Sequence, residues 1–388
     1  MRTFKSNPGG QIDPEQAIGR DALCADCWRK LNQQSLLLRA ERRIGKTTII
    51  RKLMASAPTG VRTIFRDVGG SSTTTEFVEL VIEDVETMLA DKKGFGAGIR
   101  KYVSSLAGFE IAGVLKIPET ATKQWKVILE NCFKEAHRVY QDPLVLFWDE
   151  LPWMLQKIKS TQGESAAIDL LDTLRGIRQT YKNVRMVYTG SIGLHHVLTA
   201  LEEKGQTSAP VNDMAHVDVP ALETADALKL ASELLLGEGI KVDDLPATAQ
   251  KIQELSGSIA FYIHQIVSQL VPKGTATPAA VEAMVATALN DPNDPWALRH
   301  FDTRLVTYYE HQAPWAREIL DLLANSVAGQ SFEALQKHVG GGSVDRTQLT
   351  ALLRKMQQDH YLVRNEGNRS YSFLLPLIQR WWRLYRDL

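Results

Sequence analysis

The sequence predicts an α/β protein whose first part is a parallel β-sheet covered on both faces by helices. Near-continuous apolar runs are typical of strands buried on both faces, and the chain has such runs at 35–40, 61–68, 143–150, 184–190 and 216–222. Stretches with helical periodicity separate these runs, which indicates parallel strands joined by helical crossovers. Strand signals stop near residue 223 and helical periodicity continues. A helical part therefore follows the sheet.

Length and charge limit the possibilities further. A chain of 388 residues is long enough for two or three domains. Its 45 basic and 45 acidic residues cancel, so the total charge favours neither nucleic acid nor a membrane surface. The N-terminus MRTFKSNPGGQ has no apolar stretch of the signal-peptide kind, and no apolar window is long enough for a membrane span. We expect a cytoplasmic protein without contact to a membrane.

The three cysteines fit a reducing compartment. Cys24 and Cys27 form a CxxC, which suggests half of a zinc site or a redox pair. The surrounding segment AIGRDALCADCWRKL has helical periodicity, and no second Cys or His pair follows at zinc spacing. We therefore favour a helix with two buried or half-buried thiols.

The pattern along the chain predicts an N-terminal arm (1–15), a sheet domain (16–222), a helical domain (223–294) and a C-terminal domain (295–388). Residues 91–120 are rich in glycine and weakly periodic, so we expect an insertion with a loop at FGAG and a small hairpin around FEIAGVLKI. The C-terminal domain has two helical segments, a long helix at DRTQLTALLRKMQQDHY and a ribbon with a Gly turn at YLVRNEGNRSYSF. That order is typical of a winged helix.

The segment ERRIGKTT (41–48) has the pattern of a phosphate-binding loop between a strand and a helix. There, backbone N–H groups and the helix dipole bind phosphate, Lys46 reaches the β and γ phosphates, and the Thr47 hydroxyl binds Mg²⁺. Gly45 allows close approach of the backbone. Ala40 occupies the position where the pattern usually begins with glycine. The alternative is an ordinary basic helix start, but the flanking strand and helix favour nucleotide.

Two further strand ends carry polar groups. Asp149 and Glu150 end the most apolar strand run, PLVLFWDE, at the edge where open parallel sheets bind ligands. Asp149 is suited to hold Mg²⁺ and Glu150 to act as general base; the alternative is a pair of surface carboxylates that cap a helix. Thr189-Gly190-Ser191 ends the next strand and is suited either to sense a γ-phosphate or to form an ordinary turn. Together these motifs predict an ATPase.

The order of these motifs resembles that of the archaeal-type ATPases, which belong to the STAND branch of the AAA+ superfamily and are relatives of origin-recognition ATPases. The resemblance extends from about residue 16 to 388 and rests on Ile18-Gly19-Arg20, the phosphate loop, LVLFWDE, YTGS and the C-terminal FLLPLIQRWW. It implies a P-loop core, a helical lid and a winged helix. It also implies Walker B acids at Asp149 and Glu150, a sensor-like Ser191, a Gly19-Arg20 segment that covers the adenine, and nucleotide binding by Arg42, Arg43, Ile44, Gly45, Lys46, Thr47 and Thr48.

Other candidate residues have two open interpretations each. The lid motif Gly-Gly-x-Pro of the family is replaced by Gly257-Ser258-Ile259-Ala260. His264, one turn later, is either a polar contact from the lid to the nucleotide or a histidine bonded within its own helical domain. Arg175 and Arg178 precede the sensor strand, where an arginine finger is presented to a neighbouring subunit; the alternative is that they are ordinary surface arginines.

The predicted function is a Mg²⁺-ATP switch that hydrolyses slowly and controls a partner effector protein, for example in prokaryotic antiviral defence. The alternative is an oligomeric DNA-binding AAA+ loader or transposition-type regulator that uses the winged helix. Its predicted recognition helix sets Arg346, Arg354 and Lys355 against Asp345 and Asp359, which is only weakly basic. Trp381, Trp382, Leu384 and Tyr385 offer aromatic surface to a protein partner, or else pack in the core. A nucleotide-binding scaffold without turnover also fits the motifs.

Overall fold

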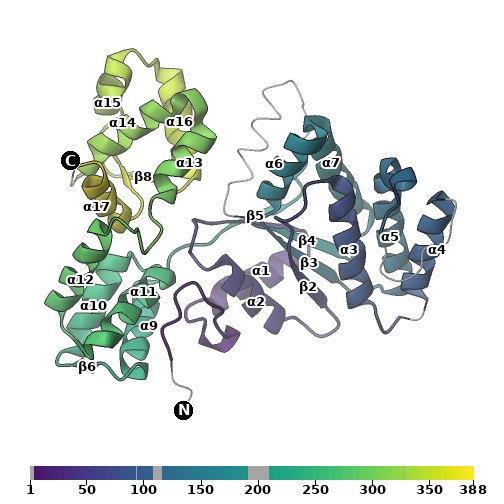
Figure 1. The fold of residues 1–388 in the computed structure, drawn as a ribbon, viewed down its shortest axis with the longest axis horizontal. Helices are drawn as coiled ribbons and strands as arrows, with labels where there is room; N and C mark the ends of the chain where they lie inside the picture. Colours follow the sequence, from purple (N-terminus) through teal and green to yellow (C-terminus); the bar gives the residue numbers. More distant parts are fainter. Residues whose placement is uncertain (1–3, 93, 108–115, 191–208, 327) are drawn as a thin grey trace. The chain divides into compact units, whose positions relative to one another are not determined.

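The computed structural model describes residues 4–92, 94–107, 116–190, 209–326 and 328–388. The chain forms two compact units (Figure 1). The first, called the core unit here, contains Arg20–Ala40 and Lys46–Val219. The second, called the C-terminal unit, contains Met1–Gly19, Glu41–Gly45 and Pro220–Leu388. The first residues of the phosphate loop thus belong to a different unit from Lys46.

The core unit contains the predicted parallel sheet. Its strands are β1 (Leu36–Arg39), β2 (Arg62–Asp67), β3 (Leu144–Asp149), β4 (Val184–Tyr188) and β5 (Ala215–Asp218). Their order is β2-β3-β4-β1-β5, and every neighbouring pair is parallel. All the strands predicted from apolar runs are therefore present, and the α/β prediction is confirmed.

The strand order positions the functional groups. Parallel strands end at a common edge of the sheet, so the residues that follow β1, β3 and β4 lie along that edge. Because β4 lies between β1 and β3, the phosphate loop after β1 and the acids after β3 are one strand apart. Asp67 at the end of β2 is in register with Asp149 at the end of β3.

Helices cover both faces of this sheet, with α1 and α2 on one face and α3, α5, α6 and α7 on the other (Figure 1). The core-unit helices are α1 (Asp21–Leu31), α2 (Lys46–Ala55), α3 (Thr74–Met88), α4 (Phe95–Ala107), α5 (Trp125–Val139), α6 (Leu151–Gln162) and α7 (Glu164–Thr180). A capping box between Thr73 and Glu76 starts α3. This capping box provides hydrogen-bond acceptors for two backbone N–H groups that the start of a helix otherwise leaves unbonded.

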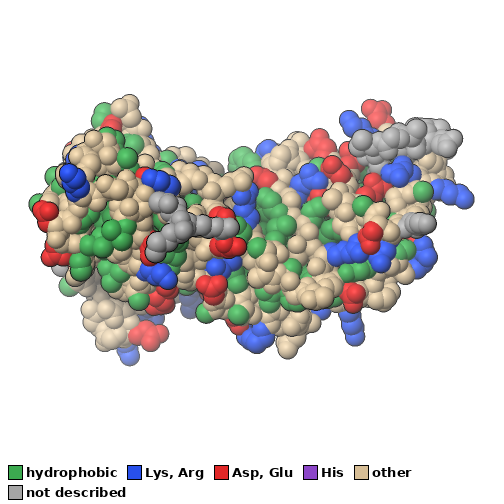
Figure 2. Space-filling view, turned by 90° about the horizontal axis from the view of Figure 1, so that it is seen from below, with side chains coloured by type: hydrophobic (Ala, Val, Ile, Leu, Met, Phe, Trp, Pro, Cys, Tyr) green, Lys and Arg blue, Asp and Glu red, His purple; other side chains and the backbone are tan. Residues whose placement is uncertain are grey.

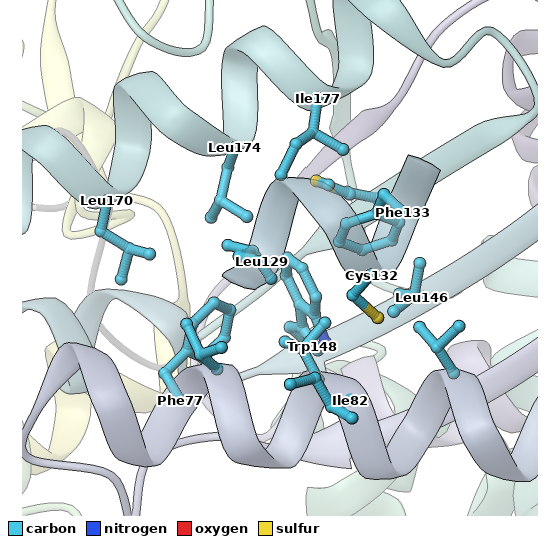
Figure 3. Close-up of a cluster of buried hydrophobic side chains, with 14 of the residues drawn as sticks. Phe77, Ile82, Leu129, Cys132, Phe133, Leu146, Trp148, Leu170, Leu174 and Ile177 are labelled. Atoms are coloured by element: carbon cyan, nitrogen blue, oxygen red, sulfur yellow. The ribbon is translucent and has the colours of Figure 1, made fainter. Parts of the chain in front are cut away.

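The main hydrophobic core lies between the sheet and the helices α3 to α7. Alternate β3 residues Leu144, Leu146 and Trp148 point into it, as expected from the two-residue period of a strand. Figure 3 shows Trp148 beside Phe77 of α3 and Leu129 of α5. The Trp148 and Phe77 rings meet edge to face with centroids 5.0 Å apart.

The prediction of a loop at FGAG is wrong, because these residues begin helix α4. Phe95, Ile99 and Val103 are buried at intervals of four residues, so they form one apolar helical face. Gly96 and Gly98 obscured this periodicity in the sequence. The hairpin expected around FEIAGVLKI falls largely on 108–115, which lie outside the described residues.

The C-terminal unit is mostly helical. Its elements are α9 (Thr224–Gly237), β6 (Lys241–Val242), α10 (Leu245–Ser256), α11 (Ala260–Leu270), β7 (Thr275–Ala276), α12 (Pro278–Asn290), α13 (His300–Tyr309), α14 (Ala313–Ala324), α15 (Phe332–His338), α16 (Arg346–Gln358), β8 (Leu362–Arg364), β9 (Tyr371–Phe373) and α17 (Pro376–Tyr385). The strands β8 and β9 form an antiparallel ribbon, and β6 and β7 form a short parallel pair that the sequence analysis did not foresee.

The aromatic residues of α17 are used mainly inside the unit. Trp381 and Trp382 are buried, and the Trp382 indole donates to Asp321 at 2.7 Å. Of the predicted aromatic surface, Leu384 and Tyr385 remain exposed. The tryptophans therefore serve core packing, the second of the two uses considered for them.

Neither a zinc site nor a membrane span is found in the part of the chain that the structure describes. Cys24 and Cys27 are free thiols buried on α1, where burial raises their pKa to about 11 and about 12. Within the described residues, no three His, Cys, Asp or Glu side chains cluster as metal ligands. In the same part of the chain, no helix combines the length and apolarity needed to cross a membrane.

Candidate active site

Lys46 and Thr47 begin helix α2 immediately after Gly45, whose φ of +101° is readily adopted only by glycine. The Lys46 side chain is buried, and its ammonium donates to the carbonyl of Ala40 at 3.4 Å. The Thr47 hydroxyl donates to the Asp149 carboxylate at 3.3 Å. The structure thus brings together two predicted site residues that are 102 positions apart.

Asp149 has the environment of a metal-binding carboxylate. One of its oxygens faces Thr47, and the other accepts the Glu150 N–H at 3.0 Å. Burial raises the pKa of Asp149, the charge of Glu150 adds to this rise, and Lys46 opposes it. A carboxylate beside a hydroxyl at a helix N-terminus is an oxygen donor set that suits Mg²⁺. The residues present therefore fit the predicted metal.

Glu150 has an unusual backbone conformation. It lies between β3 and α6 in the left-handed region, at φ 58° and ψ 28°, which costs a non-glycine residue on the order of 1 kcal/mol. Gly69 and Gly190 leave room for it. A Cβ atom at Gly69 would lie 3.0 Å from the Glu150 Cβ, and one at Gly190 would lie 2.6 Å from Pro152. The turn that aims Glu150 thus depends on two glycines that follow β2 and β4.

Backbone hydrogen bonds from Thr189, just after β4, also stabilise the turn at Glu150. The Thr189 N–H donates to the Trp148 carbonyl at 3.0 Å, and the Thr189 carbonyl accepts the Leu151 N–H at 3.1 Å. Thr189 is therefore part of the support for Glu150. Ser191, predicted as the sensor, lies outside the described residues, and its role stays a prediction.

The loop residues Glu41–Gly45 are held by contacts inside the C-terminal unit. The guanidinium of Arg43 lies 4.1 Å from the centre of the Phe261 ring on α11, and Arg43 has a φ of +66°. Burial lowers the pKa of Arg43. Ile44 is buried, whereas Arg42 is exposed and donates its N–H to the Glu41 carboxylate at 2.7 Å. Thr48 is half-buried on α2. Contact of these residues with nucleotide stays a prediction.

The predicted adenine segment divides between the two units. Gly19 has a φ of +70°, and a Cβ there would lie 2.5 Å from the carboxylate of Asp226 on α9. A side chain at this position would therefore clash inside the C-terminal unit. Arg20 is buried and precedes the first residue of α1 in the core unit. Their role toward the base remains a prediction from the family resemblance.

His264 on α11 is buried and receives a hydrogen bond from the N-terminal arm. The Asn7 N–H donates to its Nδ1 at 3.1 Å, so Nδ1 is unprotonated and the ring is neutral in this arrangement. Burial lowers the pKa of His264 to about 4. The arm is also held by Ser6, whose N–H and hydroxyl both donate to Glu238 at 2.6 Å. The structure thus gives His264 a structural partner, and a contact with nucleotide stays a prediction.

Stability should fall as the pH drops from about 6.5 to about 4, in part because of His264. Its folded pKa of about 4 lies below the usual value of 6.5, so in this interval the unfolded chain binds a proton that the folded chain excludes. The contribution lost is about 3 kcal/mol. Urea unfolding at a series of pH values measures it. His264→Asn keeps an acceptor for Asn7 but does not titrate, and an equal pH dependence in both proteins would contradict the assignment.

The prediction that Arg178 is an arginine finger is corrected by the structure. Its side chain is 3% exposed and forms an ion pair with Asp213 at 2.7 Å. It also donates to the Tyr188 hydroxyl at 2.7 Å and to the Pro210 carbonyl at 2.6 Å. A guanidinium enclosed in this way cannot be offered to a neighbouring subunit. Arg175 is half-buried on the same helix, α7, and its finger role stays a prediction.

Replacing Arg178 by methionine should destabilise the core unit by about 3 to 5 kcal/mol, because it leaves the buried partners of the guanidinium unpaired. Thermal and urea unfolding measure this loss. Arg138→Met is a matched control, since that guanidinium is 67% exposed and pairs with Glu135, three residues away. A loss of hydrolysis in Arg178→Met at unchanged stability would restore the finger interpretation.

Sequence reasoning missed several residues that shape the site. Gly69 is a spacer beside Glu150, and only its place just after a strand could have indicated this. Glu41 is a buried acid in a loop that otherwise carries basic residues, which was a visible signal. Phe261 contacts Arg43, and Arg304 donates to the Glu41 carboxylate at 2.9 Å. Both residues lie far along the chain, and no local sequence pattern connects them to the loop.

Comparison with known proteins identifies the fold. No protein-family model matches this sequence, and none of the curated proteins does. The structure is similar to the Walker-type ATPase PABY2304 of Pyrococcus abyssi, with a TM-score of 0.62, 15% identity and coverage of 99% of each chain. It is also similar to the ORC2 protein of Aeropyrum pernix in its ADPNP-ADP complexes, with a TM-score of 0.54, 12% identity and coverage of 95% of this chain and 92% of that one. The chain thus has the fold of a P-loop NTPase.

Proposed function

We propose that this protein binds Mg²⁺-ATP, hydrolyses it slowly, and uses the nucleotide as a switch to control a partner protein. The observation that carries the proposal is the contact of the Thr47 hydroxyl with the Asp149 carboxylate, 3.3 Å apart at the start of α2. It joins a phosphate-loop residue to an acid after β3, beside Glu150. The fold shared with ATPases supports the same activity.

Each residue has a distinct task in the proposed reaction. Lys46 and the N-terminus of α2 bind the phosphates through charge and backbone N–H groups. Thr47 and Asp149 hold Mg²⁺, which when bound neutralises charge that develops on the phosphate oxygens. Glu150 accepts a proton from the attacking water at its carboxylate. The left-handed turn fixes the direction in which this carboxylate points.

A switch is supported over a fast motor by the division of the phosphate loop. Residues 41–45 belong to the C-terminal unit, whereas Lys46 and Thr47 belong to the core unit. We infer that nucleotide bound at Lys46 and Thr47 acts on residues 41–45 through the continuous backbone of the loop. We infer that α14, α15, α16 and the β8–β9 ribbon form a winged helix in which the effect of the nucleotide is expressed. Homo-oligomerisation and a setting in antiviral defence stay predictions from the family resemblance.

The charges of α16 favour a protein partner over DNA. The Lys355 ammonium donates to the Tyr308 carbonyl at 2.8 Å, and Arg346 lies over the Phe332 ring at 4.6 Å. Intramolecular contacts therefore use two of the three predicted DNA-reading cations. Figure 2 shows acidic and basic side chains mixed over the face that it draws, in line with the formal net charge of zero for the whole chain.

The test is ATP binding and phosphate release by the full chain with and without Mg²⁺, beside Lys46→Ala. We expect saturable binding and slow, Mg²⁺-dependent release in the wild type, and a loss of binding of at least about 100-fold in Lys46→Ala, since the ammonium is the main charge partner of the phosphates. Lys52→Ala, on the same helix but paired with Asp21 at 3.0 Å, is the control. Wild-type binding no better than that of Lys46→Ala would refute the proposal.

The DNA alternative has its own measurement. Fluorescence anisotropy with duplex DNA at increasing salt, with and without ATP, reports binding through phosphate contacts. Arg354 is exposed on α16, so Arg354→Glu is the informative variant. Tight, salt-dependent binding that this substitution abolishes would favour the loader or transposition-type regulator.

A further inference from the structure

The first residue of the phosphate loop is a buried acid held by an arginine far along the chain. The Glu41 side chain is 4% exposed, and one of its carboxylate oxygens accepts two hydrogen bonds. One comes from the N–H of the next residue, Arg42, at 2.7 Å, and the other from Arg304 of α13 at 2.9 Å. All three residues belong to the C-terminal unit. The same carboxylate oxygen thus fixes the loop backbone and anchors it to α13.

Arg304 extends this anchor to α16 and the β8–β9 ribbon. Its side chain is 12% exposed, it lies 3.6 Å from the Asp359 carboxylate, and it covers the Tyr361 ring at 5.4 Å. Asp359 directly follows α16 and accepts the Tyr309 hydroxyl at 2.6 Å. Burial by itself would lower the pKa of Arg304, but Glu41, Tyr361 and Asp359 outweigh burial and raise it. The guanidinium is therefore a fixed charge between two carboxylates.

A second contact holds the loop two residues further on. Arg43 is left-handed, at φ +66°, and its guanidinium lies over Phe261 of α11. Such a conformation persists in a non-glycine residue only where the surroundings impose it. Glu41 and Arg43 are thus fixed from α13 and α11, and the backbone between them has little freedom. A phosphate loop ordered before the nucleotide arrives avoids the entropy cost of ordering it on binding.

We propose that Arg304 is a positioning residue for the phosphate loop: through Glu41 it holds residues 41–45 in the conformation that accepts nucleotide. The inference rests on the proposed function. It adds that Arg304, through Glu41, affects the affinity for nucleotide. A ligand that shifts α16 or β8, and with them the buried Asp359 and Tyr361, would loosen Arg304 and lower this affinity. By linkage, bound nucleotide would then weaken the binding of that ligand to the same degree.

A purely structural role for Arg304 predicts something different. Breaking a buried ion pair lowers stability wherever it lies, so a fall in melting temperature does not distinguish the two roles. A positioning role also predicts a higher Kd and KM for Mg²⁺-ATP at nearly unchanged kcat, because Arg304 acts on binding and does not touch the reacting atoms. It further predicts faster hydrogen exchange of loop amides in the nucleotide-free protein.

The experiment compares the full-length wild type with Arg304→Gln, Arg304→Lys and Glu41→Gln. The matched control is Arg317→Gln, which breaks the ion pair of Arg317 with Asp302 at 2.7 Å in the same helical block. We expect Arg304→Gln and Glu41→Gln to raise the Kd about 10-fold or more, with kcat changed less than about threefold. Arg304→Lys should fall between, and Arg317→Gln should bind like the wild type. The double variant Arg304→Gln/Glu41→Gln should have a Kd no higher than that of the single variant with the higher Kd, since both substitutions remove the same ion pair.

Hydrogen exchange of residues 41–48 without nucleotide provides a readout that does not depend on ATP binding. Faster exchange in Arg304→Gln and Glu41→Gln, but not in Arg317→Gln, supports the proposal. Wild-type Kd and wild-type exchange in the folded variants would overturn it while leaving the proposed function intact. If Arg304→Gln does not fold, Arg304→Lys and Glu41→Gln decide by the same two readouts. Absence of ATP binding by the wild type would instead refute the proposed function, and this inference with it.

Discussion

Glu150→Gln should slow ATP hydrolysis at least about 100-fold, because the amide cannot take the proton of the attacking water. The affinity for Mg²⁺-ATP should stay within about threefold of the wild type, since glutamine keeps the size of the side chain and the carboxylate proposed to bind the metal is that of Asp149. Single-turnover phosphate release measures the rate, and equilibrium titration with ATP measures the affinity.

Two comparisons make this result specific to Glu150. Asp149→Asn should reduce hydrolysis and also weaken the dependence on Mg²⁺, because it removes a charge beside the Thr47 hydroxyl. Gln162, which lies at the end of α6 and accepts the Thr74 N–H at 2.8 Å, offers a distant control in Gln162→Ala. Wild-type hydrolysis in Glu150→Gln would assign the base to another group.

Trp148→Ala should destabilise the core unit by about 3 to 5 kcal/mol, because it leaves a large cavity in the core. Trp148 is fully buried in β3, meets Phe77 edge to face, and stacks on Tyr188 with ring centroids 5.8 Å apart. The loss should appear in urea unfolding as a lower midpoint at nearly the same slope. Trp148→Phe keeps part of the volume and should lose less.

Trp153 provides the matched control for Trp148. It lies five residues further on, in α6, and is 40% exposed, so Trp153→Ala should change the stability by no more than about 1 kcal/mol. Equal losses from the two alanine variants would mean that burial in this core is not what makes Trp148 important.

The sheet could be predicted because its strands are local and buried on both faces. PLVLFWDE indicates β3 without reference to the rest of the chain, since four apolar residues and an aromatic pair suit only an enclosed strand. Helix α4 was missed because its local sequence does not indicate its structure. Its apolar face consists of Phe95, Ile99 and Val103, but the glycines between them suggest a loop. Intrinsic preference and tertiary burial disagree there, and burial determines the structure.

The part of the candidate site that follows the strands could be predicted from the order of the motifs along the chain. Lys46 and Thr47 follow one strand and Asp149 and Glu150 follow another, so the parallel sheet brings them to one edge. The partners of Glu41 and Arg178 could not be found in this way. Arg304 is 263 positions from Glu41, and an arginine in a helix looks the same in sequence whether it is enclosed by Asp213 and Tyr188 or faces solvent.

The passage of the chain from the core unit into the C-terminal unit at Glu41–Gly45 and back has a consequence for how the protein can be cut. A fragment that ends at Val219 would keep Lys46, Thr47, Asp149 and Glu150, yet its loop would lack Phe261 and Arg304. Such a fragment would carry the proposed catalytic groups without the residues that hold Glu41 and Arg43. Domain swaps or truncations at residue 219 would therefore leave Glu41 and Arg43 without Arg304 and Phe261, their partners within the C-terminal unit.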